Sequence, residues 1–95
     1  MGYNTIADAS YSTAMGYHTK TGADASCVVV MGRHNRPVDN ALLLIGAGKN
    51  SDASRNIIEV ISNQSKDTFN INCNTDISAN LDVSGTIILL SLIHI

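Results

Sequence analysis

The chain has 95 residues, of which 44% are hydrophobic and 15% are charged, and its formal net charge at pH 7 is −2. This length and composition are typical of one soluble domain or of a fragment of a longer protein. The six Lys and Arg residues are scattered singly along the chain, so the sequence offers no basic stripe for a phosphate backbone, and nucleic acid is not expected as a partner.

A short landmark, Met or Ile followed by glycine, recurs four times in the first half of the chain. Successive landmarks are fourteen, sixteen and fourteen residues apart. The longer spacing comes from TKTGADAS at 19–26, which has two residues more than TIADAS at 5–10, and the extra residues are expected in a turn. A period this short suits two short strands and two turns per repeat. The repeat-forming residues are therefore Gly2, Gly16, Gly32, Gly46, Met15, Met31 and Ile45.

The residues before each glycine form strand-like runs at 12–15, 28–31 and 42–45. Alternate side chains of a strand point to opposite faces, so equivalent residues are expected to stack in two sets. One face carries Thr13, Val29 and Leu43 with Met15, Met31 and Ile45; the other carries Ser12, Val28 and Leu42 with Ala14, Val30 and Leu44. Strands that are apolar on both faces are normally covered on both. The interior of the stack covers one face, and another copy of the chain is expected to cover the second.

The pattern S-x-A-[MI]-G, recurring about every fourteen residues with A-x-A-S between copies, resembles the head of YadA-type trimeric autotransporter adhesins, whose repeats also occur in phage tail fibres. The resemblance covers residues 1–48. It implies an all-β fold, a left-handed parallel β-roll with coils of about fourteen residues, associated as a homotrimer. It also implies a non-catalytic fibre module that attaches to an unknown receptor on a host or cell surface, on a virion tail fibre or on the bacterial surface.

The second half of the chain is expected to leave the roll and enter a fibre shaft. Residues 49–68 resemble the exit loop and strand of such rolls, with the polar SNQSKD as a further loop. Residues 69–89 contain three hexads, whose aliphatic second positions share one face of a continuous strand or stack in a narrow β-helix. These positions are Ile71, Ile77 and Val83. Residues 90–95, LSLIHI, resemble a translated sequencing adapter, or else form a genuine buried strand; they are too few to cross a membrane, and no membrane insertion is expected.

One set of turns carries a row of long polar or aromatic side chains, and these are the candidate receptor-facing residues: Tyr3, Tyr17, His18, Arg33 and His34. His18 and His34 hold the same place in successive copies, so they are expected about 4.8 Å apart. The two histidines either form an exposed stacked ladder or form a metal or anion site. No carboxylate or thiol recurs beside the two histidines, so no metal is expected. Asp8 and Asp24 stack likewise as turn carboxylates.

No residues suggest catalysis or a cofactor. LLLIGAGKNS at 42–51 imitates a phosphate-binding loop, but the required glycine and hydroxyl are replaced by Leu43 and Asn50. Stacked identical turns place residues in rows rather than in a converging pocket, so the chain is not expected to be an enzyme. Cys27 and Cys73 lie far apart without a CxxC pair and are expected to be small, half-buried hydrophobic residues.

Two functions fit these observations. In the first, the exposed turns of a trimeric fibre attach to a cell surface through many weak contacts. In the alternative, the chain is a purely structural spacer, and receptor binding is carried out by a domain outside this sequence. The sequence gives no indication of the receptor.

Overall fold

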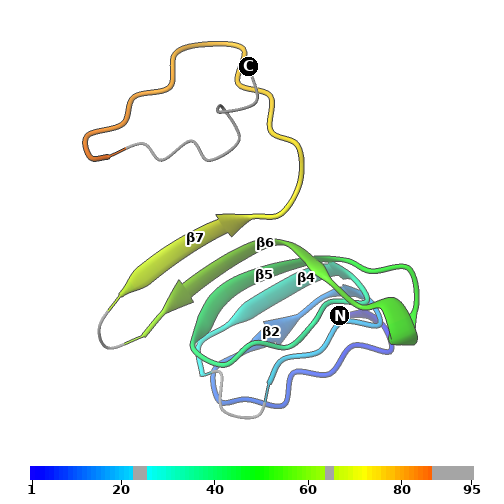
Figure 1. Ribbon diagram of the computed structural model, residues 1–95. Helices are drawn as coiled ribbons and strands as arrows, with labels where there is room; N and C mark the ends of the chain where they lie inside the picture. The colour runs from blue at the N-terminus through cyan, green and yellow to red at the C-terminus, as the bar shows by residue number, and fades with distance from the viewer. Residues whose placement is uncertain (23–25, 64–65, 87–95) are drawn as a thin grey trace.

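The computed structural model describes residues 1–22, 26–63 and 66–86 and is built from strands and turns, as Figure 1 shows. The described residues contain no α-helix, and their one 3-10 turn is η1, Ser51–Ala53. The predicted all-β class is confirmed. The strands are β1 Gly2–Tyr3, β2 Thr13–Ala14, β3 Gly16–Tyr17, β4 Val29–Arg33, β5 Ala41–Ala47, β6 Asn56–Ser62 and β7 Asp67–Ile71.

All seven strands belong to one mixed sheet. Its order is β1-β3-β4-β5-β6-β7, and β2 pairs with β4. Strands β1 to β5 pair in parallel. Strand β6 is antiparallel to β5, and β7 is antiparallel to β6. This switch coincides with the end of the repeat at Gly46, after which a polar turn leads into a strand rich in β-branched residues.

Equivalent residues of successive copies pair in register, as the repeat predicts. Gly2 pairs with Gly16, and the third and fourth glycines, Gly32 and Gly46, pair in the same way. Predicted stacks are present on both faces, where each residue pairs with its equivalent on the next strand. One stack is Thr13, Val29 and Leu43, and the other is Ala14, Val30 and Leu44. The two extra residues of the second copy therefore leave the register unchanged.

The small core lies on one face of the parallel strands. Val28, Val30 and Leu44 are completely buried there, and Ala41 packs with them. The residues between them in sequence, Val29, Met31, Leu43 and Ile45, point to the opposite face and are only partly buried. The sequence predicted two apolar faces, and the fold shows which of them is internal.

Leu42 departs from the predicted stack with Val28. Val28 is fully buried, but Leu42 is 46% exposed. A β-bulge explains the difference, since Ala41 pairs with Ile61 and Leu43 with Val60, which leaves Leu42 as the extra residue. The bulge reverses the alternation of side chains, so Leu42 and Leu43 both lie outside the core.

Three of the repeat glycines occupy backbone that other residues rarely adopt. Gly2, Gly16 and Gly32 have φ angles of 112°, 112° and 101°. Gly46 differs, because it lies inside β5 and is buried against the backbone of Arg33 and Asn35. Gly46 is therefore needed for close packing and not for a positive φ angle.

Buried polar side chains join one copy of the repeat to the next. The Asn35 amide accepts a hydrogen bond from the Lys20 N–H and donates one to the Lys20 carbonyl, at 2.7 and 2.8 Å. Asn56 makes the same pair of bonds to Arg36. Thr21, one of the residues in the longer second copy, is fully buried, and its hydroxyl accepts a bond from Asp8 N–H at 2.8 Å. Thr21 therefore contributes a buried contact between the first and second copies.

The described residues 72–86 form no strand or helix. Figure 1 shows the chain leaving β7 and running away from the sheet. A continuous strand or a narrow β-helix was expected over residues 69–89. Among the described residues of this segment, only those up to Ile71, the last residue of β7, form a strand. The aliphatic side chains beyond it, Ile77, Leu81 and Val83, are 41 to 66% exposed. The suspected adapter segment, 90–95, lies outside the described residues.

The two cysteines also differ from expectation. Cys27 and Cys73 are both free and exposed, not half-buried. Cys27 lies at a tight turn with a φ angle of 65°, directly before the buried Val28, and Cys73 lies just beyond β7. Among the described residues, no helix has the length and apolar character needed to cross a membrane.

Candidate functional site

The turns that follow the repeat glycines share one backbone conformation. Asn4, His18 and His34, each two residues after its glycine, have φ angles of 51°, 51° and 39°. Asparagine and histidine occur in this left-handed region more often than most residues. Since the strands before these turns are in register, the turns project their side chains in the same direction.

The side chains on these turns form two stacked rows. The rings of Tyr3 and Tyr17 are 5.3 Å apart and nearly parallel, at 11°. The rings of His18 and His34 are 4.8 Å apart and inclined by 8°, which confirms the spacing predicted from the repeat. Tyr17 joins the two rows, because its ring meets His18 edge-on at 4.3 Å and His34 at 5.4 Å.

Each row continues into a neighbouring copy with a different side chain. Arg33 pairs with Tyr17 in the sheet and extends the tyrosine row. Asn4 extends the histidine row, with its Nδ2 atom 3.5 Å from Nε2 of His18. Tyr3 and Tyr17 are 61% and 49% exposed, and Arg33 is also exposed. The structure therefore brings all five predicted residues together on one accessible surface.

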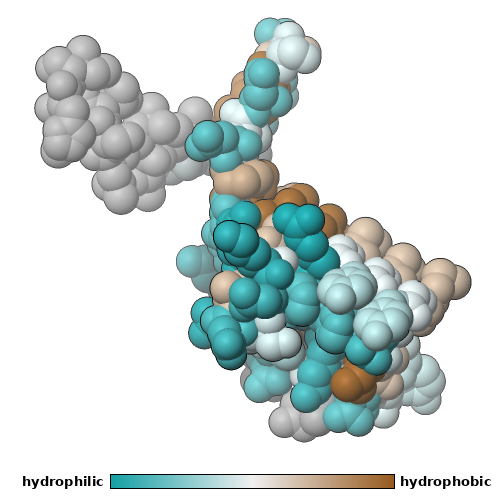
Figure 2. Space-filling view, turned by 90° about the vertical axis from the view of Figure 1, so that its right-hand side faces the viewer, coloured by the Kyte–Doolittle hydropathy of each residue, from teal (hydrophilic) through white to brown (hydrophobic). Residues whose placement is uncertain are grey.

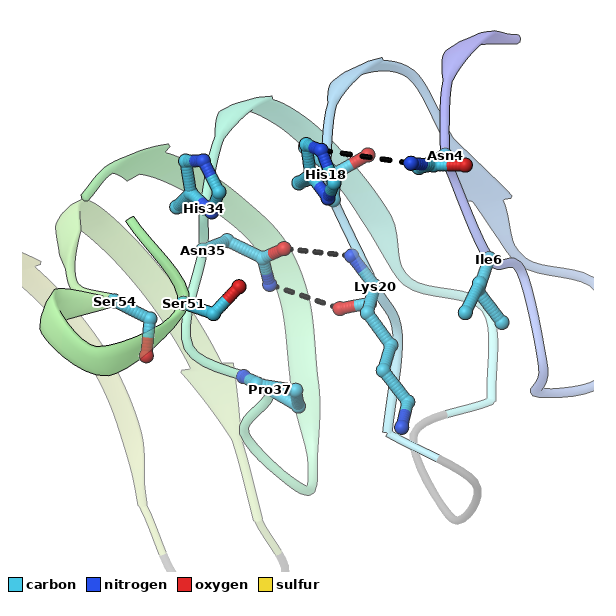
Figure 3. Close-up of a pocket in the computed structure, with 10 residues that line it drawn as sticks. Asn4, Ile6, His18, Lys20, His34, Asn35, Pro37, Ser51 and Ser54 are labelled. Atoms are coloured by element: carbon cyan, nitrogen blue, oxygen red, sulfur yellow. Dashed lines mark hydrogen bonds between the residues drawn. The ribbon is translucent and has the colours of Figure 1, made fainter. Parts of the chain in front are cut away.

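A groove of about 230 Å³ runs beside the histidine row. Figure 3 shows His18 and His34 along one side of it, Lys20 and Asn35 in the middle, and Ser51 and Ser54 near η1. The two bonds from Asn35 fix the backbone of Lys20, while the lysine side chain remains exposed. Most of the residues that line the groove are polar, and Ile6 and Pro37 add apolar surface to it.

The sequence did not identify Lys20, Asn35, Ser51 or Ser54 as part of this site. A signal was present for Lys20, because it and Arg36 follow the candidate turns at the same place in successive copies. The two serines could not be found in this way. They belong to the segment around η1, which lies outside the repeat and is brought to the groove by the reversal between β5 and β6.

The stacked imidazoles are poorly arranged to share one metal ion. Their planes are nearly parallel and their centroids are 4.8 Å apart. The nitrogen lone pairs of the two rings therefore lie in two separate parallel planes and do not converge on one point. Within residues 1–22, 26–63 and 66–86, no group of three or more His, Cys, Asp or Glu residues is placed to hold a metal. What the surface does offer is hydrogen-bond donors, aromatic edges and positive charge.

Comparisons with protein families, curated proteins and solved structures found no match for this chain. The role of the surface is therefore argued from its own geometry.

Proposed function

We propose that the chain is a non-catalytic module of a trimeric fibre that attaches to a host or cell surface, on a phage tail or on a bacterium. The observation that carries the proposal is the in-register stacking of the turns, which repeats the Tyr and His side chains along one exposed edge. Repetition of one weak contact along a rigid stack and over three chains increases overall binding by avidity, without a catalytic step.

The finer form of the fold belongs to this proposal. Parallel pairing at offsets of fourteen, sixteen and fourteen residues, with a separate bridge between Ile6 and Lys20 on the returning segment, supports a β-roll with one coil per repeat. Its left-handed sense is taken from the resemblance to YadA-type heads. The roll lengthens by adding coils, and every added coil contributes one more turn to the exposed edge.

The trimer is supported by the outer face of the sheet, which nothing in the chain covers within the described residues. Cross-strand pairs align two apolar rows over β4 to β7, and Phe69 and Ile71 at the edge are 63% and 48% exposed. Apolar surface of this kind is removed from water by association. One row is Val29, Leu43, Val60 and Phe69, and the other is Met31, Ile45, Ile58 and Ile71.

The solution mass of the chain tests the trimer. Light scattering on a sizing column at micromolar concentration is expected to give three times the chain mass of 10.1 kDa. A folded monomer would contradict the trimer and remove the avidity on which the proposed attachment depends.

Binding to cells tests the turn surface. Tyr3, Tyr17 and Arg33 are replaced by Ala, and His18 and His34 by Asn, because Asn4 already occupies the equivalent left-handed turn. Cell binding is expected to fall at unchanged oligomer mass.

The matched control is Tyr11→Asn on the opposite set of turns, where Asn40 has the same left-handed backbone. This control should bind as the parent does. Unchanged binding by the first variant would favour the structural spacer.

A further inference from the structure

The stacking gathers cationic residues at the carboxyl ends of the parallel strands. Five exposed cationic residues lie at or just beyond the carboxyl ends of β3, β4 and β5, or beside them where β6 begins; together they define the basic edge: Lys20, Arg33, Arg36, Lys49 and Arg55. Asp39 lies at the amino end of β5, and Asp8 lies in the segment that leads to β2. Asp52, in η1, lies three residues after Lys49 and is therefore a carboxylate near the basic edge. Figure 2 shows this side of the molecule covered largely by hydrophilic residues.

Two adjoining grooves lie along the basic edge. Among the described residues that line the first, the charged group is Lys20, and His18 and His34 lie beside it without any carboxylate. The second groove, of about 320 Å³, is lined by Arg36 and Arg55. Ser54 lines both grooves, so they form a continuous surface.

Glu59 is the carboxylate that lines the second groove. Its two oxygens already accept hydrogen bonds, one from Nδ2 of Asn56 at 3.0 Å and one from Nδ2 of Asn70 at 3.4 Å. Its charge is therefore partly compensated by amide donors, and the two arginines remain exposed to solvent. The five cations outnumber the two carboxylates beside them, Asp52 and Glu59, so the edge is net positive and favours anions.

We propose that the basic edge binds an acidic polysaccharide, a chain of sugars that carry carboxylate or sulfate groups. The proposal rests on the proposed attachment function and names its receptor class. Neighbouring strands lie about 4.8 Å apart, so the cations are distributed along the stack and do not surround one point. An extended polyanion contacts several of them at once, whereas a small anion contacts only one or two.

The aromatic row favours sugars over single-stranded nucleic acid. Bases bind such surfaces by stacking on free aromatic faces. Stacking within the pairs Tyr3–Tyr17 and His18–His34 takes up one face of each ring, which leaves fewer faces for bases. The row also offers phenol hydroxyls, ring edges and the exposed Arg33. Together with the hydroxyls of Ser51 and Ser54, these groups match the hydroxyls and carboxylates of sugars.

Binding of the full chain to defined polymers tests the proposal. Polygalacturonate carries carboxylates, dextran sulfate carries sulfates, dextran is neutral, and a single-stranded DNA oligomer of mixed sequence represents nucleic acid. We expect binding to at least one acidic polysaccharide, weaker binding at higher salt, and none to dextran. Tighter binding to the DNA would overturn the proposal in favour of a nucleic-acid surface. Failure to bind either acidic polymer would also overturn it.

Variants separate the basic edge from general charge. Lys20→Gln with Arg33→Gln is expected to weaken binding about tenfold, since each exposed ion pair contributes at most modestly. Lys20→Arg with Arg33→Lys keeps both charges and should bind within about twofold of the parent. Lys66→Gln, in the loop between β6 and β7, removes a cation away from the edge. Equal weakening by Lys66→Gln would mean that binding is unspecific and would overturn the proposal.

A cell assay distinguishes this proposal from the proposed function. Cells are treated with enzymes that remove surface acidic polysaccharide, and attachment of the chain is measured before and after. Loss of attachment supports both proposals. Attachment that persists overturns the receptor class but leaves the attachment function in place. Binding to purified polysaccharide without attachment to any cell would overturn the attachment function alone.

Discussion

Gly16 and Gly32 lie where neighbouring copies of the repeat approach closely. A Cβ atom on Gly16 would overlap the carbonyl oxygen of Gly32, and its φ angle of 112° is unfavourable for any other residue. We expect Gly16→Ala to lower the free energy of unfolding by more than about 2 kcal/mol. Gly85→Ala is the control, because nothing lies within 4 Å of the added carbon. Urea unfolding followed by circular dichroism measures both; equal midpoints would contradict the close approach.

The side chain of Asn35 makes the two hydrogen bonds to Lys20 that a neighbouring strand's backbone would otherwise make. It is 5% exposed and occupies both the N–H and the carbonyl of that residue. Asn35→Leu should lower the free energy of unfolding by about 1–3 kcal/mol, because it leaves two backbone groups without partners. Asn80→Leu, at an exposed position, should change it by less than about 0.5 kcal/mol. Thermal unfolding compares the two variants, and equal losses would refute the special role of the buried amide.

The alternation of β5 is reset by its bulge, and this gives adjacent leucines different roles. Leu44 is fully buried in the core, whereas Leu42 is 46% exposed. Leu44→Ala is expected to cost about 2–5 kcal/mol of unfolding free energy. Leu42→Ala should cost less than about 1 kcal/mol. Chemical unfolding of both variants tests the bulge, since a regular strand in which Leu42 stacks with Val28 would make both substitutions costly.

The whole molecule has an apolar outer face that a single chain leaves partly exposed. Ile45 lies near the middle of one of its rows, paired with Met31 on one side and Ile58 on the other. A carboxylate at this position would be buried in the proposed trimer without a partner, at a high free-energy cost. We therefore expect Ile45→Asp to reduce the solution mass to that of one chain.

The control for this change is Ser10→Asp, which adds the same charge at an exposed turn residue. It should leave the mass unchanged, as measured by light scattering on the same column. If Ile45→Asp also keeps the mass of the parent, the outer face is not the surface through which the chains associate.

Much of the candidate site followed from the repeat alone. Tyr17, His18 and His34 could be placed together because a fixed period puts equivalent turns side by side. The groove could not be foreseen, since Ser51 and Ser54 reach it through the antiparallel return of β6. The basic edge was missed for a different reason. Its cations are scattered along the sequence and gather in space only once the turns are stacked, although the equivalent places of Lys20 and Arg36 in successive copies carry this signal.

The sequence by itself determined the all-β class, the register of the stacked copies and the spacing of the histidine row, because each depends on a local period that any stacked arrangement preserves. Only the tertiary structure decided which face is internal, where the β5 bulge exposes Leu42, that Thr21 and Asn35 are buried, and that residues 72–86 form no strand within one chain. These features depend on contacts between segments far apart in the sequence, and a local pattern carries no information about which partner each segment meets.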